Sequence, residues 1–296
     1  MARALMQTAA ALALWAAPGT VEGQERVPTG FERLGAFRSS MVRESSGVAM
    51  SRRHAGIIWT HNDSGDGPYI YAATLDGTIV GRHLVTGARA QDWEDVALAP
   101  CPDQLGDCLF IADTGDNSES RRSSSVYIVP EPDNVQTAGR SPRATSPARQ
   151  LQFSYPDRPH DVEAMWIDPD GTVELVTKGL TGSILRFRLP HRTWERVPIV
   201  AEAAGMLAIA PQRALGRWIT GGAISPGGAR VALRTYTEVF FFAAGESGTL
   251  LQDGPPCWLG TREPQGEAVD FIDGQTLVLT SEAAFGQEGS IHTVRC

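Results

Sequence analysis

An all-β fold of repeated four-strand units is what this 296-residue sequence predicts. Five segments begin alike, and each is followed by a turn signal and a short apolar stretch. They start at Ser46, Glu94, Glu163, Gly222 and Glu267. Turn signals such as Asp-Pro-Asp-Gly at 168–171 and Ser-Pro-Gly-Gly at 225–228 favour β-hairpins. Beyond the N-terminal leader, no segment shows the sustained 3.6-residue periodicity of an amphipathic helix.

Antiparallel units of this kind, repeated every ~45 to 70 residues, are typical of a β-propeller. We expect five blades in one domain over residues 31–296. Six blades would require a degenerate blade within residues 201–218, where there is barely room. The last unit ends after its third strand, so residues 31–37 are expected to supply its outer strand and close the ring. A two-sheet β-sandwich is the alternative, and the recurring strand–turn–strand phase disfavours it.

Some elements can be placed more finely. Residues 78–84 and 194–200 are expected to be the fourth strands of the first and third units. The Pro-, Ser- and Arg-rich stretch 130–149 reads as an exposed loop inside blade two. Large aromatic side chains such as Trp59 and Trp166 are expected to pack between blades.

Composition excludes two classes of function. The chain carries 34 acidic and 26 basic side chains, a net charge of −8. This argues against a nucleic-acid partner, because phosphate binding needs a concentrated basic surface. No run of 18 apolar residues occurs, so no transmembrane segment is expected.

The N-terminus resembles a secretory signal peptide over residues 1–23. Arg3 precedes the apolar stretch 9–17, and small and polar residues follow it. A disordered or helical tail is the alternative. We expect a secreted or periplasmic protein.

Four cysteines agree with export, because an oxidising compartment makes disulfides durable. Cys101 and Cys108 bracket a short turn and suit a staple across a hairpin. Of the three possible connectivities, this one leaves Cys257 paired with Cys296. CxxC spacing is absent, which disfavours a zinc or redox site.

In a propeller the start of each innermost strand and the end of the second strand lie on one face. Residues far apart in sequence therefore surround one channel mouth. The candidate metal ligands there are Asp63, Glu94, Asp113, Glu163 and Glu267. The candidate ligand-binding residues there are His61, Asn62, Lys178, Arg234 and Glu282.

Three glutamates at one repeat position need an explanation, because isolated buried carboxylates are costly. Several carboxylate and amide oxygens suit a hard divalent cation such as Ca²⁺. Crowding would raise some of the carboxyl pKa values unless a cation or Lys178 offsets it. The alternative is a water-filled polar channel with internal ion pairs and no ligand.

One loop motif occurs twice. The sequence Asp-Ser-Gly-Asp-Gly at 63–67 is echoed by Asp-Thr-Gly-Asp-Asn at 113–117. Oxygen ligands on a tight, glycine-permitted turn suggest a calcium loop. The twelfth-position Glu of an EF-hand is missing, and Asx-turn chemistry is the alternative.

The segments Asp-Trp-Glu-Asp-Val-Ala at 92–97, Asp-Thr-Gly-Asp-Asn at 113–117 and Trp-Thr-His-Asn-Asp-Ser-Gly at 59–65 carry a family resemblance, as does 220–237. Together they resemble a group of secreted bacterial β-propeller proteins without an assigned activity. More distantly, the arrangement looks like calcium-dependent propeller hydrolases. That resemblance implies Ca²⁺, but no catalytic motif matches, so it implies no substrate.

Two hypotheses of function follow. The first is an exported propeller that binds a small polar ligand or divalent cation at the channel mouth. The second is a metal-dependent hydrolase of phosphoesters or lactones. In that case Glu94, Glu163 and Glu267 would hold the cation, and Lys178 and Arg234 would stabilise developing negative charge.

Overall fold

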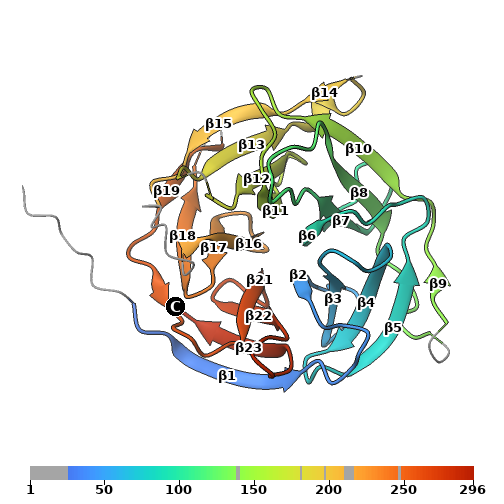
Figure 1. Cartoon of the computed structure of the whole chain (residues 1–296), viewed down its shortest axis with the longest axis vertical. Helices are drawn as coiled ribbons and strands as arrows, with labels where there is room; N and C mark the ends of the chain where they lie inside the picture. Colours follow the sequence, from blue (N-terminus) through green and yellow to red (C-terminus); the bar gives the residue numbers. More distant parts are fainter. Residues whose placement is uncertain (1–25, 138–140, 181, 197, 210–216, 246–247) are drawn as a thin grey trace, which may run out of the picture.

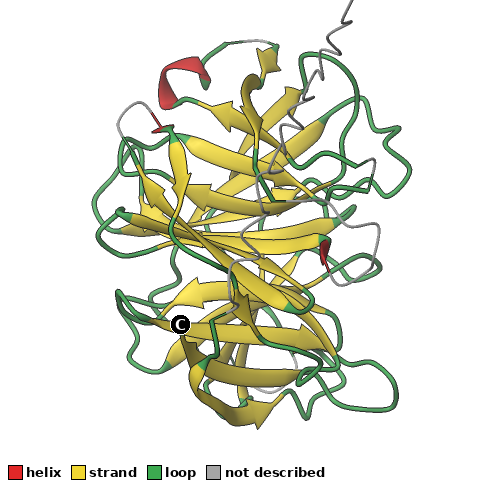
Figure 2. Ribbon diagram, turned by 90° about the vertical axis from the view of Figure 1, so that its left-hand side faces the viewer, coloured by secondary structure: helices red, strands yellow, loops and turns green. Residues whose placement is uncertain are grey.

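Five antiparallel sheets surround a common axis in this protein, as Figure 1 shows. The structure is a computed structural model that describes residues 26–296, except 138–140, 181, 197, 210–216 and 246–247. Seen from the side in Figure 2, the regular structure is nearly all strand, with short helical turns such as η1 (His191–Thr193). The prediction of an all-β, five-bladed propeller is confirmed. The predicted signal peptide, 1–23, lies outside the described residues.

In each blade the strands follow one another from the axis outward. Blade one contains β2 (Ser45–Met50), β3 (Ile57–Asn62), β4 (Tyr69–Thr74) and β5 (Ile79–Leu84). Blade two contains β6 (Trp93–Pro100), β7 (Asp107–Asp113), β8 (Ser124–Pro130) and β10 (Arg149–Ser154). Blade three contains β11 (Val162–Ile167), β12 (Val173–Thr177), β13 (Leu185–Leu189) and β15 (Glu202–Met206).

The last two blades are less regular at their outer edges. Blade four contains β16 (Ile219–Ile224), β17 (Arg230–Thr235) and β18 (Glu238–Ala244), followed by β19 (Leu250–Gln252) and β20 (Cys257–Trp258), which both pair with β18. Blade five contains β21 (Gln265–Phe271), β22 (Thr276–Glu282), β23 (Ser290–Arg295) and β1 (Thr29–Ala36). The N-terminal strand β1 runs antiparallel to β23, which confirms the predicted closure of the ring.

Two short strands link neighbouring blades. β9 (Arg143–Ala144) lies in the stretch expected to be an exposed loop, and it pairs in parallel with β5 of blade one. β14 (Ile199–Val200) pairs in parallel with β10 of blade two. The prediction that 194–200 forms the outer strand of blade three is therefore wrong. Trp194 is buried between blades two and three and keeps this segment against blade two.

The outer strand of blade three is instead β15, which pairs with β13. Because β15 falls within residues 201–218, the six-blade alternative is wrong as well. The expectation for residues 78–84 is confirmed by β5.

The hydrophobic core is divided among the junctions between blades. Five clusters of buried side chains occur in the described residues, and each draws on two adjacent blades. Trp59 and Trp93 pack between blades one and two, and Trp166 packs between blades three and four. Each sheet is buried on both faces, which explains why a strand such as β3 is buried at every position, without alternation.

Carboxylate side chains connect the inner strands across the axis. Asp95 of blade two accepts hydrogen bonds from the backbone N–H groups of Met165 in blade three (2.8 Å) and Gly222 in blade four (3.2 Å). Asp270 of blade five accepts one from Met50 in blade one (2.6 Å). These bonds supply acceptors to inner-strand N–H groups that have no neighbouring strand on the axial side.

Both predicted disulfides are present. Cys101–Cys108 joins the ends of the hairpin between β6 and β7, and Cys257–Cys296 joins blade four to the end of blade five. Next to the second disulfide, Arg26 forms a parallel bridge with Cys257, so both ends of the described chain meet there.

The two disulfides should differ in their contribution to stability. They span sequence separations of 39 and 7 residues. In the chain-entropy model these loops correspond to about 4 kcal/mol and about 2.4 kcal/mol of the free energy of unfolding. We therefore expect the Cys257→Ser/Cys296→Ser variant to lose more stability in urea unfolding than Cys101→Ser/Cys108→Ser. A larger loss in the hairpin variant would contradict this.

Candidate functional site

A β-bulge near the start of every inner strand positions the candidate site. In each blade the pairing of the inner strand with the second strand skips one residue. The skipped residues are Ser46, Glu94, Glu163, Thr220 and Glu267. A bulge re-aims a side chain, and here it repeats at one end of the axis. We call this end the acidic mouth.

One predicted member of the ring is wrong. Gly222 was expected at the repeat position of blade four, but it pairs directly with Leu233. The bulge residue of blade four is Thr220, whose hydroxyl donates to the Glu267 carbonyl oxygen at 2.9 Å. The predicted position was two residues too late because blade four has no acidic residue at the repeat position.

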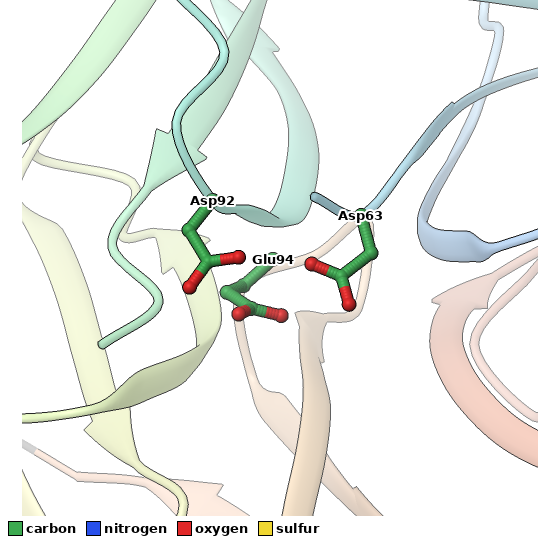
Figure 3. A group of neighbouring side chains, drawn as sticks. All are labelled: Asp63, Asp92 and Glu94. Carbon is green, nitrogen blue, oxygen red and sulfur yellow. The ribbon is translucent and has the colours of Figure 1, made fainter. Parts of the chain in front are cut away.

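Carboxylates from three blades converge on Glu94. In the first trio (Asp63, Asp92 and Glu94), one oxygen from each residue lies within 4.8 Å of the others. Figure 3 shows the three carboxylates directed toward one another. The second trio (Glu94, Asp161 and Glu163) meets the same distance limit and is buried throughout.

The first trio joins blades one and two. Asp63 follows the last residue of β3, and Asp92 precedes the first residue of β6. Glu94 is 3% exposed, and its Oε2 accepts one long bond from the Ser46 hydroxyl at 3.4 Å. Among the described residues, no donor to Glu94 Oε1 is found.

The second trio carries an ammonium group. Lys178 Nζ lies 2.5 Å from Glu163 Oε1 and 3.9 Å from Asp161 Oδ2. Asp161 Oδ1 accepts the backbone N–H of Asp116 at 2.7 Å, while Oδ2 accepts no hydrogen bond within the described part of the chain. Lys178 is the only lysine in the sequence.

Blade five contributes a further pair of carboxyl groups. Gln265 Nε2 donates to Glu267 Oε1 and to Glu282 Oε2, each at 2.8 Å. The side-chain amide therefore holds these two groups together. Tyr236 lies near them, and burial followed by the charge of Glu267 raises the pKa of its phenol.

Burial and mutual repulsion raise the carboxyl pKa values at the mouth. Burial, then the charge of Asp63, raises the pKa of Asp92 to about 7. Burial raises the pKa of Glu163 to about 8, although the Lys178 charge opposes this. For Glu282, burial and the charge of Asp63 raise the pKa to about 8. For Glu94, burial and the charge of Glu163 raise the pKa well above its usual range.

The pKa of Lys178 is raised as well, and for an ammonium this favours the charged form. Burial alone disfavours its ammonium, but the charges of Glu163 and Asp161 outweigh burial and raise its pKa. Lys178 is therefore charged at neutral pH and stabilises ionised neighbours. One ammonium faces many carboxylates, so the mouth keeps an excess of negative charge once they ionise.

Gly115 allows this crowding. A Cβ atom on this residue would lie 2.0 Å from Glu94 Oε1 and 2.6 Å from Asp92 Oδ2. In the other copy of the loop motif, Gly65 has a φ of +85° and open space around it. The first glycine is needed for close approach, and the second for its backbone conformation.

The aspartates of the two loop motifs separate into different roles. Asp66 and Asp116 accept bonds within their own loops, for example from Asn62 Nδ2 (2.8 Å) and from the Arg121 N–H (2.6 Å). Asp113 accepts the Arg121 guanidinium at 3.0 Å and lies outside both trios. Asp63 alone of the four joins a trio.

Arg234 is occupied elsewhere. It is fully buried, forms an ion pair with Glu263 and donates to the carbonyl oxygens of Ala268 (2.8 Å) and Thr280 (3.1 Å). It therefore joins blades four and five and has no exposed surface for a ligand.

His61 and Asn62 also serve the fold. The His61 ring is fully buried against Trp93, and burial lowers its pKa, which keeps it neutral. The Asn62 amide accepts two backbone N–H groups and donates to the carbonyl oxygen of Met41 and to Asp66. Its hydrogen-bonding capacity is fully used.

Three site residues were missed by the sequence reasoning. Asp92, Asp161 and Gln265 each stand two positions before a bulge glutamate, in Asp-x-Glu, Asp-x-Glu and Gln-x-Glu. This repeated spacing was the available signal. It was missed because the residues precede the strands that defined the repeat.

The other end of the axis differs chemically. It holds a cavity of about 430 Å³, lined by inner-strand residues such as Met50, Leu98 and Phe271. None of the two trios' carboxylates reaches it. Among the described residues, both trios of carboxylates lie at the mouth.

A scan against protein-family models finds no match, and a sequence search of curated proteins finds none. The predicted family resemblance therefore stays a prediction. Among solved structures, a PQQ-bound aldose sugar dehydrogenase from Streptomyces coelicolor is 10% identical, with a TM-score of 0.49, over 91% of this chain and 99% of that one.

Two other solved structures are similarly distant. A virginiamycin B lyase from Staphylococcus aureus is 10% identical, with a TM-score of 0.44, over 90% of this chain and 99% of that one. The Cps50 (Swd1) β-propeller domain from Myceliophteria thermophila is 13% identical, with a TM-score of 0.43, over 90% and 99%. At these identities no activity follows for this chain.

The Gly115→Ala substitution should destabilise the protein, because its Cβ would collide with Glu94 and Asp92. We expect a loss of about 1 to 3 kcal/mol in the free energy of unfolding. Gly227→Ala is the matched control, since nothing lies within 4 Å of its added Cβ. Urea unfolding of both variants tests this, and equal stabilities would show that Gly115 is not needed for close approach.

Proposed function

We propose that the acidic mouth binds a divalent cation, Ca²⁺, in an exported protein. The observation that carries this proposal is the convergence of carboxylates from three blades on Glu94, with a single ammonium among them. Glu94 itself is 3% exposed, and its Oε1 accepts no hydrogen bond from the described residues. Such an arrangement is costly unless a cation compensates it.

The donor set favours a hard cation. Both trios consist of carboxylates alone, without histidine or cysteine. Ca²⁺ takes six to eight oxygen ligands and tolerates irregular geometry, whereas Zn²⁺ prefers nitrogen and sulfur. Three carboxylates and bound water can complete such a shell.

Export is part of the proposal. Two disulfides suit an oxidising compartment. Over the described residues, no helix combines the length and apolar character needed to span a bilayer. Together with the predicted signal peptide 1–23, the disulfides support a secreted or periplasmic location.

Calcium should stabilise the protein, and more so at high pH. Carboxyl groups whose folded pKa is raised, such as Asp92 (about 7) and Glu163 (about 8), favour the folded state while protonated. Without calcium, that stability is lost as the pH rises from about 4 to about 8. Saturating Ca²⁺ at a hundred times Kd should restore about 2.7 kcal/mol at pH 8. At pH 5, protons compete with the ion and the effect should be small.

The measurement is the melting temperature in EDTA and in Ca²⁺ across this pH range. Glu94→Gln should abolish the calcium effect, because it removes the carboxylate shared by both trios. Glu32→Gln, an exposed change on β1, is the control and should keep the effect. A melting temperature that does not respond to Ca²⁺ at pH 8 would favour a hydrated channel without a ligand.

A second candidate function is a calcium-dependent hydrolase of phosphoesters or lactones. The observation in its favour is the Glu267–Gln265–Glu282 bridge. Burial and neighbouring charge raise the pKa of Glu282 to about 8, so this carboxyl group can hold a proton at neutral pH and donate it. A bound Ca²⁺ would polarise a phosphoryl or carbonyl oxygen.

If the protein is such an enzyme, the calcium-loaded form should turn over a member of a phosphoester and lactone panel. Glu282→Gln should then reduce kcat by about 10² to 10⁴-fold, because it removes a proton donor. Its calcium-dependent stabilisation should persist, which separates the chemical role from ion binding. Wild-type kcat in Glu282→Gln, or no turnover on the panel, would eliminate this candidate and leave the binding function in place.

A further inference from the structure

The two trios share Glu94 but differ in what already neutralises them. The position of the ion, given the proposed cation site, depends on this difference. In the described part of the chain, no lysine, arginine or histidine nitrogen lies within 4 Å of a carboxylate oxygen of the first trio. In the second trio, Lys178 contacts Glu163 and approaches Asp161.

The first trio has carboxylate oxygens that accept few hydrogen bonds. Asp63 Oδ1 accepts only the N–H of its neighbour Ser64, at 2.6 Å. Glu94 is almost fully buried, yet its Oε1 finds no donor among the described residues. The close backbone of Gly115 keeps Glu94 and Asp92 at short range.

The second trio is occupied by the one lysine of a chain whose other basic residues are arginines. An ammonium is a compact point charge with three donors, whereas a guanidinium is a broad planar fork. Among monovalent side chains, lysine therefore most resembles a metal ion in size and charge. The Lys178 side chain is 11% exposed, so it is fixed within the acidic group.

We propose that the mouth binds one divalent cation in the first trio, and that the Lys178 ammonium takes the place of a second cation in the second trio. Glu94 is the carboxylate common to both positions. The lysine excludes a second ion by charge repulsion and by occupying Glu163. Asp161 Oδ2 also lies near this ammonium, at 3.9 Å from Lys178 Nζ.

This arrangement predicts a change in stoichiometry. In calorimetric titration with CaCl₂ at pH 8, the wild-type full chain should bind one ion. Lys178→Met should bind two, because both trios are then open, and Lys178→Met/Asp161→Asn should return to one. Asp92→Asn should weaken wild-type binding at least tenfold. Arg192→Met removes an exposed cation that pairs with Glu202 away from the mouth, and this control should still bind one ion.

A second measurement does not depend on the folding of Lys178→Met. Protein labelled with ¹⁵N and ¹³C only in lysine gives a single side-chain NMR signal, because the sequence contains one lysine. On Ca²⁺ addition, this signal should shift slightly and keep the slow hydrogen exchange of an ion-paired ammonium. Movement to the position of a solvated lysine would mean that the ion displaces Lys178, and would overturn the proposal.

The outcomes separate this inference from the proposed function. Two ions in the wild type, or one ion in a folded Lys178→Met variant, would overturn the role of Lys178 while the calcium site stands. A wild-type protein that binds no Ca²⁺ by calorimetry would overturn both.

Discussion

The inner strands of this propeller have one edge without a neighbouring strand. The structure depends on how the backbone hydrogen-bonding groups at that edge find partners. Backbone N–H groups that face the axis need acceptors. Asp95 supplies them to blades three and four, and Asp270 supplies one to blade one. Hydroxyl groups such as that of Thr220 serve the carbonyl oxygens in the same way. Polar residues along the axis are thus required by the architecture itself.

The candidate site consists of the polar side chains at the axis that are not used for these backbone hydrogen bonds. Asp95 is fully used by backbone donors, and Arg234 by carbonyl oxygens and a carboxylate. Glu94, Asp63 and Asp161, in contrast, retain oxygens that no part of the fold needs. The excess of acceptors over donors distinguishes the mouth from the rest of the axis, and it is the physical reason to expect a cation there.

Much of the fold could be predicted because it follows local rules. A few residues of sequence are enough to recognise an apolar strand buried on both faces, a hairpin turn or a pair of cysteines. The outer strand of blade three could not be predicted in this way. Residues 194–200 have a local preference for a strand of blade three, but burial of Trp194 between two blades holds them against blade two. At the site, Glu94 and Glu163 stood at a visible repeat position. Asp92 and Asp161 were not recognised as site residues, because they precede the strands that define the repeat. Arg234 was predicted to bind a ligand, but it is buried by contacts with the neighbouring blade, which the sequence pattern does not show.

The pairing of β1 with β23 joins residues near the two ends of the described chain, with Thr29 opposite Arg295. Contacts of such long sequence separation form late, because the intervening chain must first be ordered. During synthesis, β1 therefore has no partner strand until β23 has been made. The ring is closed only when β23 has been made, and the blades formed before it share an open edge until then.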